Sequence, residues 1–180
     1  GHVVQVGTPE EILRNPADDY VRSFTQGVDA SIVFKAGDVA KQSQTVLQEK
    51  SGKGLRAALR LLEDSDREYG YVVSAHRQFK GIVSIDSLRN ARDGSNQLQP
   101  LSEAFLPEID VVQSDELVAN LIGRVAQPHY ALPVVDEKGV FLGAISRTRL
   151  LRFLDKDTPP IPEETAVSTA VATEKGIANA

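Results

Sequence analysis

Two serines stand at the positions in the chain that are best suited to hold a phosphate group. Ser84 and Ser146 each follow a β-branched run and precede apolar residues at helical spacing, so each is predicted at a strand-to-helix junction. A serine there usually caps the helix, and the free N–H groups of the same helix end attract phosphate. Arg147 and Arg149 follow Ser146, where they can bind a phosphate or an acidic partner, or form the more common solvated helix face.

The residue patterns of enzymes and metal sites are missing from the sequence. The 180-residue chain has no cysteine, which excludes thiol nucleophiles, disulfides and cysteine-ligated zinc. His76 and His129 have no carboxylate or second histidine at ligand spacing, so neither predicts a metal site. Gly52-Lys53-Gly54 lacks the spacing of a phosphate-binding loop and is interpreted as a loop before a helix. We therefore expect no catalytic and no metal-binding residues.

Charge and composition narrow the class of protein further. The formal net charge of −5 argues against a nucleic-acid partner, because phosphate binding requires a basic surface. No apolar run reaches the roughly 18 residues of a membrane span, and no signal-peptide pattern opens the chain. The sequence has no methionine, so we expect it to begin inside a longer protein or behind an expression scar. These features predict a cytoplasmic chain without a membrane span, ending in a disordered acidic tail at residues 156–180.

An internal duplication organises the chain. Residues 69–89 repeat the pattern of residues 131–151 without a gap, at a shift of 62 positions. Each copy predicts two short strands and a helix, which in the second copy are Ala131–Val135, Val140–Ile145 and a helix after Ser146. The matched pairs are Val72/Val134, Val73/Val135, Phe79/Phe141, Gly81/Gly143, Val83/Ile145, Ser84/Ser146 and Leu88/Leu150. One such unit cannot bury its own apolar face, so the copies are predicted to pack together.

The N-terminal segment, residues 1–27, predicts a short strand and two helices. The strand is expected at His2–Val6. Thr8 is expected to cap a helix that ends near Arg14, with Glu11 completing a capping box. Asn15 is expected to cap a second helix. The predicted buried stripe of this second helix comprises Tyr20, Val21 and Phe24.

Each copy is also predicted to begin with a strand and a helix. In the first copy these are residues 45–49 and 55–64. In the second copy they are a strand at 109–112 and a helix capped by Ser114. The residues of that helix predicted to face inward are Leu117, Val118, Leu121, Ile122 and Val125. Short helices are expected near 37–41 and 102–105, and a linker at 92–96.

The start of the chain resembles the end of a known ATPase domain. The string VVQVGTPEEILRNPADDYVRSF, within the N-terminal segment, resembles the motif G-x-[IV]-x-Q-x-G-[ST]-P-x-E-[IL] of ABC importer ATPases. In that family the motif follows the last conserved histidine of the ATP site. The resemblance implies that every catalytic group lies upstream. This chain is therefore expected not to hydrolyse ATP, although the parent subunit would bind ATP as an ABC-type transport ATPase.

The duplicated unit resembles the CBS domain. Its second copy contains LPVVDEKG at 132–139 and GAIS at 143–146, as in the CBS pattern, whereas the first copy has Tyr71 in place of Pro133 and no glycine in its hairpin turn. The resemblance implies an α/β (α+β) fold of two tandem β-α-β-β-α repeats, packed as a pseudo-two-fold pair called a Bateman module. An ATPase end fused to such a pair and an acidic tail is similar to the ATP-binding subunits of glycine betaine/L-proline ABC importers.

These resemblances divide the chain into four parts. In order, they are the C-terminal end of an ABC nucleotide-binding domain (1–27), CBS repeat 1 with its connector (28–93), CBS repeat 2 (97–155) and the acidic tail (156–180). The implied partners are a second copy of the chain, the ATPase domain and membrane permease subunits, with no nucleic acid. The implied location is the cytoplasmic face of the inner (plasma) membrane, through the transporter complex.

The resemblance also implies a ligand cleft between the repeats. Its candidate residues are Tyr71, Ser84, Ser87, Pro133, Ser146, Arg147 and Arg149. In CBS pairs that bind adenosine nucleotides, an aspartate three residues after the junction Ser or Thr accepts the ribose hydroxyls, whereas Ser87 and Arg149 hold these positions here. The candidate ligands are an adenine nucleotide or cyclic di-AMP, of which the latter would not need that aspartate at a dimer seam. Gly81 and Gly143 are interpreted as marking a bulge or close packing, rather than a ligand pressed against the backbone.

Three functions fit the sequence. The first is a regulatory module that tunes ATP-driven osmoprotectant uptake in response to ionic strength, since contacts between exposed charges weaken as salt rises. The acidic tail and the basic helix start at Arg147 and Arg149 offer such contacts. The second function is a receptor for an adenine nucleotide or a cyclic dinucleotide. The third is a dimerisation module without ligand, which would hold two ATPase subunits together.

Overall fold

The computed structural model describes residues 2–49, 54–93 and 100–155 of the chain. The helices in these ranges are α1 (Pro9–Arg14), α2 (Asp19–Thr25), α3 (Ala36–Val39), α4 (Leu55–Asp64), α5 (Ile85–Asp93), α6 (Leu121–Arg124) and α7 (Arg147–Leu154). The strands are β1 (Val46–Gln48), β2 (Tyr69–Val73), β3 (Phe79–Ser84), β4 (Val112–Gln113), β5 (Leu132–Val135) and β6 (Phe141–Ile145). Within the described ranges, no helix has the length and apolar character needed to span a bilayer.

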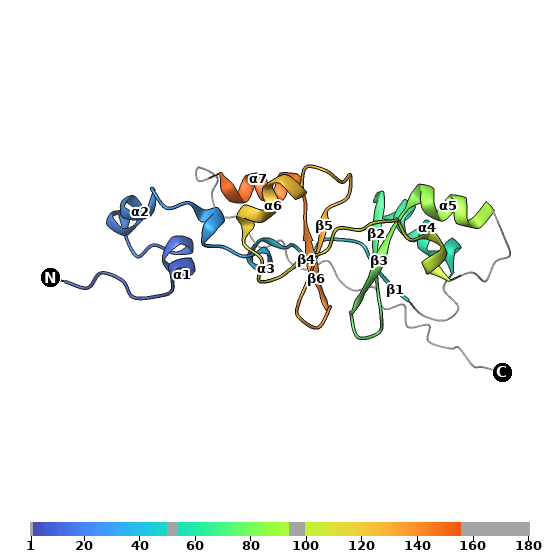
Figure 1. The fold of residues 1–180 in the computed structure, drawn as a ribbon, viewed down its shortest axis with the longest axis horizontal. Coiled ribbons are helices and arrows are strands. Elements are labelled where there is room, and N and C mark those ends of the chain that lie inside the picture. The colour runs from blue at the N-terminus through green and yellow to red at the C-terminus, as the bar shows by residue number, and fades with distance from the viewer. Residues whose placement is uncertain (1, 50–53, 94–99, 156–180) are drawn as a thin grey trace, which may run out of the picture.

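The two copies form two similar three-stranded sheets. In each sheet the first strand runs parallel to the second, and the second pairs antiparallel with the third, in the orders β1-β2-β3 and β4-β5-β6. The register shifts at Val72/Val73 in one sheet and at Val134/Val135 in the other, which are matched positions of the two copies. Figure 1 shows the two hairpins lying next to each other, with α1 and α2 at the end of the molecule beyond the second copy. The predicted fold of two tandem α/β repeats is confirmed.

A pseudo-two-fold axis passes between the two hairpins. The isolated bridge between Gln78 and Val140 joins residues that occupy matched positions 62 apart in the sequence. On its two sides, the N–H of Phe79 donates to the carbonyl of Gly139, and the N–H of Phe141 donates to the carbonyl of Arg77, both at 2.9 Å. These two hydrogen bonds are equivalents of each other under the same shift. The duplication in the sequence is therefore also a symmetry of the backbone contacts.

The segment before each copy packs into the core of the other copy. Residues from the connector before the first copy lie in the core of the second copy, and residues before the second copy lie in the core of the first. The connector residues are Phe34, Ala36 and Val39, and those before the second copy are Leu101 and Ala104. Burial of a large apolar side chain contributes roughly 1.5–3 kcal/mol. Neither copy therefore has a complete core of its own.

Backbone hydrogen bonds hold each of these segments against the copy whose core it enters. Lys41 and Ala144 exchange two hydrogen bonds, of 3.1 and 3.0 Å, and the N–H of Leu106 donates to Ile82 at 2.8 Å. The close approach requires glycine at the neighbouring strand position, because a Cβ on Gly143 would lie 2.6 Å from the Lys41 carbonyl oxygen. A Cβ on Gly81 would likewise lie 2.7 Å from the ring of Phe105. The prediction that both glycines mark a bulge or close packing is confirmed.

Several elements of the N-terminal segment differ from the prediction. Residues 2–6 form no strand, because a strand requires a partner and no described strand lies beside them. The cap of α2 is Asp18, whose side chain accepts from the N–H of Val21, and not Asn15. Val21 is buried, but Tyr20 and Phe24 are 70% and 77% exposed, so the predicted buried stripe is wrong at two of its three positions. The capping box of Thr8 and Glu11 on α1 is confirmed.

The first helix of the second copy also begins later than predicted. Ser114 caps no helix, and the chain turns helical only in the 3₁₀ turn Val118–Asn120, which leads into α6. The cause is a pairing with the connector: the N–H of Ala36 donates to Glu116 at 2.8 Å, and that of Gly37 to Ser114 at 2.9 Å. These bonds hold residues 114–116 in a turn in place of a first helical turn, and Leu117 is 39% exposed. Ile122, also predicted inward, is 49% exposed.

Other predicted elements lie close to their expected positions. Helix α4 has the predicted bounds, and its four apolar residues at helical spacing, Leu55, Ala58, Leu59 and Leu62, are buried. Of the strand expected at 109–112, only residue 112 lies in a strand, β4. The short helices expected near 37–41 and 102–105 are present as α3 and the 3₁₀ turn Leu101–Ala104. The linker predicted at 92–96 overlaps the end of α5, and its remaining residues lie outside the described part of the chain. The tail at 156–180 also lies outside it.

The turn between β5 and β6 offers a direct measure of backbone strain. Gly139 has φ +75°, and a Cβ built there would touch nothing within 4 Å, so Gly139→Ala would add only the cost of a left-handed alanine. We expect a loss of about 1 kcal/mol in the free energy of unfolding, measured by urea denaturation. The matched control is Gly123→Ala in α6, which also meets nothing within 4 Å and is expected to stabilise by about 0.5 kcal/mol. Equal effects of the two substitutions would contradict this explanation.

Candidate functional site

The two junction serines act as helix caps. The Oγ atom of Ser84 accepts from the N–H of Ser87 at 3.0 Å, and the Oγ atom of Ser146 accepts from the N–H of Arg149 at 3.1 Å. In the first copy the cap is reciprocal, because the Oγ atom of Ser87 accepts from the N–H of Ser84 at 2.9 Å and donates to its carbonyl. The capping prediction is confirmed for both serines.

The arginines after the second serine bind backbone carbonyls. Arg147 donates from Nη2 to the carbonyl of Ala126 at 2.6 Å, and Arg149 donates from Nε to the carbonyl of Val39 at 3.1 Å. Arg149 thereby joins α7 to the connector helix α3. This role was not among the predicted alternatives, which were a phosphate site, a site for an acidic partner and a solvated helix face. The guanidinium groups thus hydrogen-bond backbone carbonyls within the second copy and its connector.

Two predicted cleft residues lie inside the seam between the copies. Tyr71 is only 1% exposed, its ring stacks on Phe141 with centroids 5.2 Å apart, and its hydroxyl donates to the carbonyl of Ala131 at 2.6 Å. Burial raises the pKa of the Tyr71 hydroxyl well above its usual value, because the charged form would be poorly solvated. Pro133 is buried on β5. Neither side chain faces an open cleft in this conformation.

Aromatic residues from both copies fill this seam. Phe79 stacks on Phe141 with centroids 5.9 Å apart, and Tyr69 meets Tyr130 edge to face at 6.2 Å. The pKa of Tyr69 is raised as well, mainly by burial and secondly by a hydrogen bond with Glu68. Such aromatic pairs contribute about 0.5–1.5 kcal/mol each beyond the area they bury. The seam is thus a packed interface between the copies, and the seven predicted site residues divide between it and two separate helix starts.

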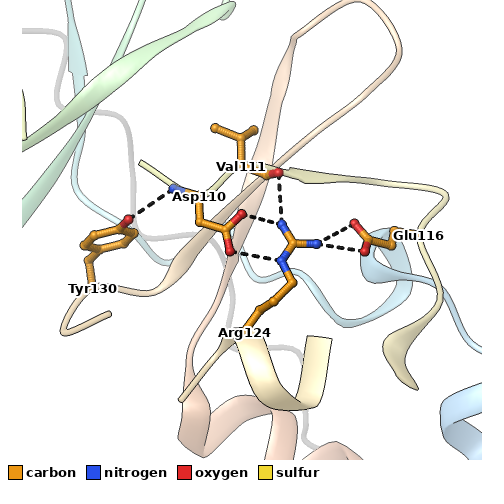
Figure 2. A network of polar contacts seen from close by, with 5 residues as sticks. All are labelled: Asp110, Val111, Glu116, Arg124 and Tyr130. Atoms are coloured by element: carbon orange, nitrogen blue, oxygen red, sulfur yellow. Dashed lines mark hydrogen bonds and ion pairs between the residues drawn. The ribbon is translucent and has the colours of Figure 1, made fainter. Parts of the chain in front are cut away.

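A charged network stands at the edge of this seam. Arg124, at the end of α6, donates from Nε and Nη2 to the carboxylate of Asp110 and from Nη1 to both oxygens of Glu116, at 2.7 and 2.8 Å (Figure 2). Nη2 also donates to the carbonyl of Val111 at 3.2 Å. The hydroxyl of Tyr130 accepts from the N–H of Asp110 at 3.2 Å, which connects the network to the aromatic seam. Pairing with Asp110 raises the pKa of Arg124, so the guanidinium stays charged.

The sequence reasoning missed this network. Its members lie on three separate stretches, and the positions in the first copy that match Asp110, Glu116 and Arg124 hold Gln48, Gly54 and Leu62. The repeat therefore gave no second instance of the pattern. A usable signal was the odd arginine at a position where the matched helix has a buried leucine. The network links residues 110 and 116 to α6, and residues 114–116 form a turn where the spacing alone predicts the start of a helix.

A hollow among the described residues does not coincide with the predicted cleft. A shallow hollow of about 390 Å³ lies where α4 ends and α5 begins, and it contains none of the predicted cleft residues. Its lining residues are Leu62, Glu63, Asp66, Arg67, Glu68 and Ile85. Within residues 2–49, 54–93 and 100–155, no three histidine, aspartate or glutamate side chains are grouped as metal ligands. The ligand-binding role of the predicted cleft remains a prediction.

Comparison of the sequence identifies related proteins. Residues 102–156 match the family model of the CBS domain. The chain is 48% identical over 158 residues to the glycine betaine/proline betaine transport system ATP-binding protein ProV of Salmonella typhimurium. That match covers 87% of this chain and 39% of the relative, so the chain spans about two fifths of the length of the curated relatives it matches.

The fold is similar to those of solved CBS proteins. OpuCA of Staphylococcus aureus superposes with a TM-score of 0.55 at 18% identity, over 64% of this chain and 95% of that chain. CbpB in complex with c-di-AMP superposes with a TM-score of 0.60 at 13% identity, over 68% of this chain and 85% of that chain. At these identities the likeness concerns the fold alone. The expected CBS-pair architecture is confirmed.

The charged network predicts an unequal response to loss of arginines. Arg124→Met removes a guanidinium that neutralises two partly buried carboxylates, so we expect a loss of about 2 kcal/mol in the free energy of unfolding, measured in urea. The matched control is Arg60→Met, because Arg60 is 84% exposed and pairs only along its own helix with Asp64. The control is expected to cost less than about 0.5 kcal/mol. Similar losses in both variants would contradict a structural role for the network.

The seam predicts an alkaline loss of stability that depends on Tyr71. Burial raises the pKa of Tyr71 in the folded state, so its stabilising contribution is complete below the unfolded pKa of about 10 and is lost as pH rises beyond it. Tyr71→Phe should cost about 1 kcal/mol at pH ~7, since the bond to Ala131 is lost, yet lose less stability between pH ~9 and ~11. Tyr20→Phe, at a 70% exposed position, is the control in thermal unfolding. Parallel pH profiles for wild type and Tyr71→Phe would refute the assignment.

Proposed function

From the premise that this chain carries a CBS domain at residues 102–156 and folds as a CBS pair, we propose that it regulates an osmoprotectant importer. In this proposal it is the C-terminal part of the ATP-binding subunit of a glycine betaine/proline ABC importer. The observation that carries the proposal is the 48% identity over 87% of the chain to the Salmonella transport protein. Its partners would be the preceding ATPase domain, the permease subunits and a second copy of the chain, at the cytoplasmic face of the membrane.

The signal in this proposal is ionic strength. The described residues include ion pairs that join separate elements at the surface, such as Arg14 with Asp38 and Arg89 with Glu63. The screening length is about 10 Å at 0.1 M salt and about 3 Å at 1 M, so such pairs weaken as the cell loses water and its salt concentrates. A fold held partly by such pairs changes its preferred arrangement with salt. The catalytic work of the transporter would remain with the ATPase domain.

A second candidate function is a receptor for cyclic di-AMP, or for an adenine nucleotide. It is supported by the fold likeness to CbpB in complex with c-di-AMP. Two positions at which nucleotide-binding CBS pairs carry an aspartate favour ionic sensing over nucleotide binding, because the residues there already make internal hydrogen bonds. Ser87 is engaged with Ser84, and Arg149 donates to Val39. A nucleotide ribose would therefore have to displace internal hydrogen bonds.

The regulatory proposal predicts a separable salt response. In the parent subunit, assembled with its permease in vesicles, truncation after Gly27 should remove most of the dependence of uptake on potassium chloride while ATP hydrolysis persists. The matched control ends at Asp155 and keeps both repeats, which tests the acidic tail separately. If the subunit truncated after Gly27 keeps the full salt response, the CBS pair is not the sensor.

The receptor candidate is distinguished by ligand titration. Thermal unfolding of the 180-residue chain with cyclic di-AMP, AMP, ADP or ATP, at low and at high salt, would reveal a ligand that binds the folded state, because such a ligand raises the melting temperature saturably. A saturable rise would favour the receptor. Unchanged melting with all four nucleotides would leave ionic sensing as the better supported function.

A further inference from the structure

The N-terminal segment contacts the second copy at the end of α1. Leu13 at the end of α1 packs against the core of the second copy. Beside it, Nη2 of Arg14 lies 3.2 Å from Oδ1 of Asp38 on α3. The same guanidinium lies over the ring of Phe34, 5.5 Å from its centroid. In Figure 1, α1 accordingly approaches the second copy and stands far from the first.

The receiving side of this contact is held rigidly. Phe34 is 5% exposed and meets Phe153 of α7 edge to face, with centroids 5.0 Å apart. Asp38 is fixed by a second bond, because its Oδ2 accepts from the N–H of Lys35 at 3.0 Å. Arg14 therefore docks on a prepared surface that is part of the second copy's core.

Helix α3 connects this surface to the seam between the copies. The N–H groups at the start of α3 donate to the carbonyls of Ser114 and Glu116. Glu116 binds Arg124, which binds Asp110, and Asp110 in turn meets the hydroxyl of Tyr130 in the seam (Figure 2). A continuous series of bonded groups thus runs from the seam to α1. A rearrangement of the two copies has a physical route to the N-terminal segment.

The two ionic contacts along this route differ in their sensitivity to salt. Arg14 and Asp38 share a single close contact, and their side chains are 52% and 32% exposed. Arg124 is 30% exposed, uses three nitrogens and is held by two carboxylates. At about 1 M salt the screening length of roughly 3 Å is similar to the Arg14–Asp38 separation, whereas the multidentate contacts of Arg124, and above all its contact with the 24% exposed Glu116, are screened less. Arg14–Asp38 is thus the contact that salt weakens first.

We propose that Arg14 and Asp38 form a salt-weakened latch between the N-terminal segment and the second CBS repeat. The latch is closed at low ionic strength and opens as ionic strength rises. The proposal deepens the regulatory function above and rests on it for one step only, that the closed latch is the low-uptake state. In this proposal the second repeat contacts the N-terminal segment directly. The first repeat affects that segment only through its contacts with the second repeat in the seam. Arg14 and Asp38 are positioning residues and take part in no chemistry.

The latch itself is tested on the 180-residue chain. A double-mutant cycle of Arg14→Gln and Asp38→Asn, by urea unfolding at about 0.05 M and about 1 M potassium chloride, measures the coupling of the pair alone. We expect a coupling of about two- to five-fold in the unfolding equilibrium constant at low salt and none at high salt. Asparagine can still accept the Lys35 N–H, so the start of α3 is kept. Coupling that is absent at low salt, or unchanged at high salt, overturns the latch.

The regulatory role is tested in the parent transporter. Arg14→Gln should raise uptake at low salt by about two- to five-fold and flatten the salt response. The control is Arg22→Gln, whose pair with Asp19 lies within α2 and links no separate elements. Identical salt profiles for the two variants overturn the regulatory role of the latch. The truncation after Gly27 separates this failure from failure of the sensor function, because only the latter leaves the truncated subunit salt-responsive.

Discussion

The structure depends on the inability of either repeat to bury its own apolar surface. A three-stranded sheet with two helices leaves one sheet face exposed. In this chain two kinds of contact cover that face: the hairpins pair at the Gln78–Val140 bridge, and each repeat binds the segment that precedes the other repeat. A unit of about 60 residues is marginal alone because too little of its surface is buried. The exchange makes the two repeats one cooperative body. Any force on the connector before the first repeat therefore acts directly on the second.

The near symmetry of the backbone makes the departures from it informative. At the hairpin turns, Gly139 takes φ +75° without strain, while its counterpart Arg77 takes φ +61° and donates to the Phe141 carbonyl across the axis. On the helical faces, the charged residues Arg60 and Arg89 of the first repeat correspond to the exposed apolar residues of the second, Ile122 and Leu151. The Arg124 network belongs to the second repeat alone. The repeats share a scaffold but present different chemistry, and the latch contacts with the N-terminal segment lie on the second.

The elements that were predictable are those whose causes are local. Helix α4 has a regular apolar stripe and nothing pairs with its start among the described residues, so its bounds follow from spacing alone. The equivalent stretch of the second repeat has the same stripe, but hydrogen bonds to residues 36 and 37 override it. The surroundings of two predicted site residues differ from the expectation for a related reason. Family likeness placed Tyr71 and Pro133 in a cleft, whereas packing across the seam buries both, and Arg124 finds its partners 8 and 14 residues away on segments that spacing alone does not bring together.

Magnitudes decide what a latch of this kind can do. An exposed ion pair contributes at most about 1 kcal/mol, which changes an equilibrium about five-fold. Moving a two-state protein from 1:99 to 99:1 needs about 5.5 kcal/mol, so one latch can grade activity but cannot switch it fully. Two copies acting together in a dimer would give roughly 2 kcal/mol, or about thirty-fold. A stronger contact would not serve better, because a partly buried, multidentate pair such as that of Arg124 and Glu116 resists the screening through which salt acts. Sensitivity to ionic strength requires contacts that are weak, exposed and placed at a junction, and the Arg14–Asp38 pair has each of these properties.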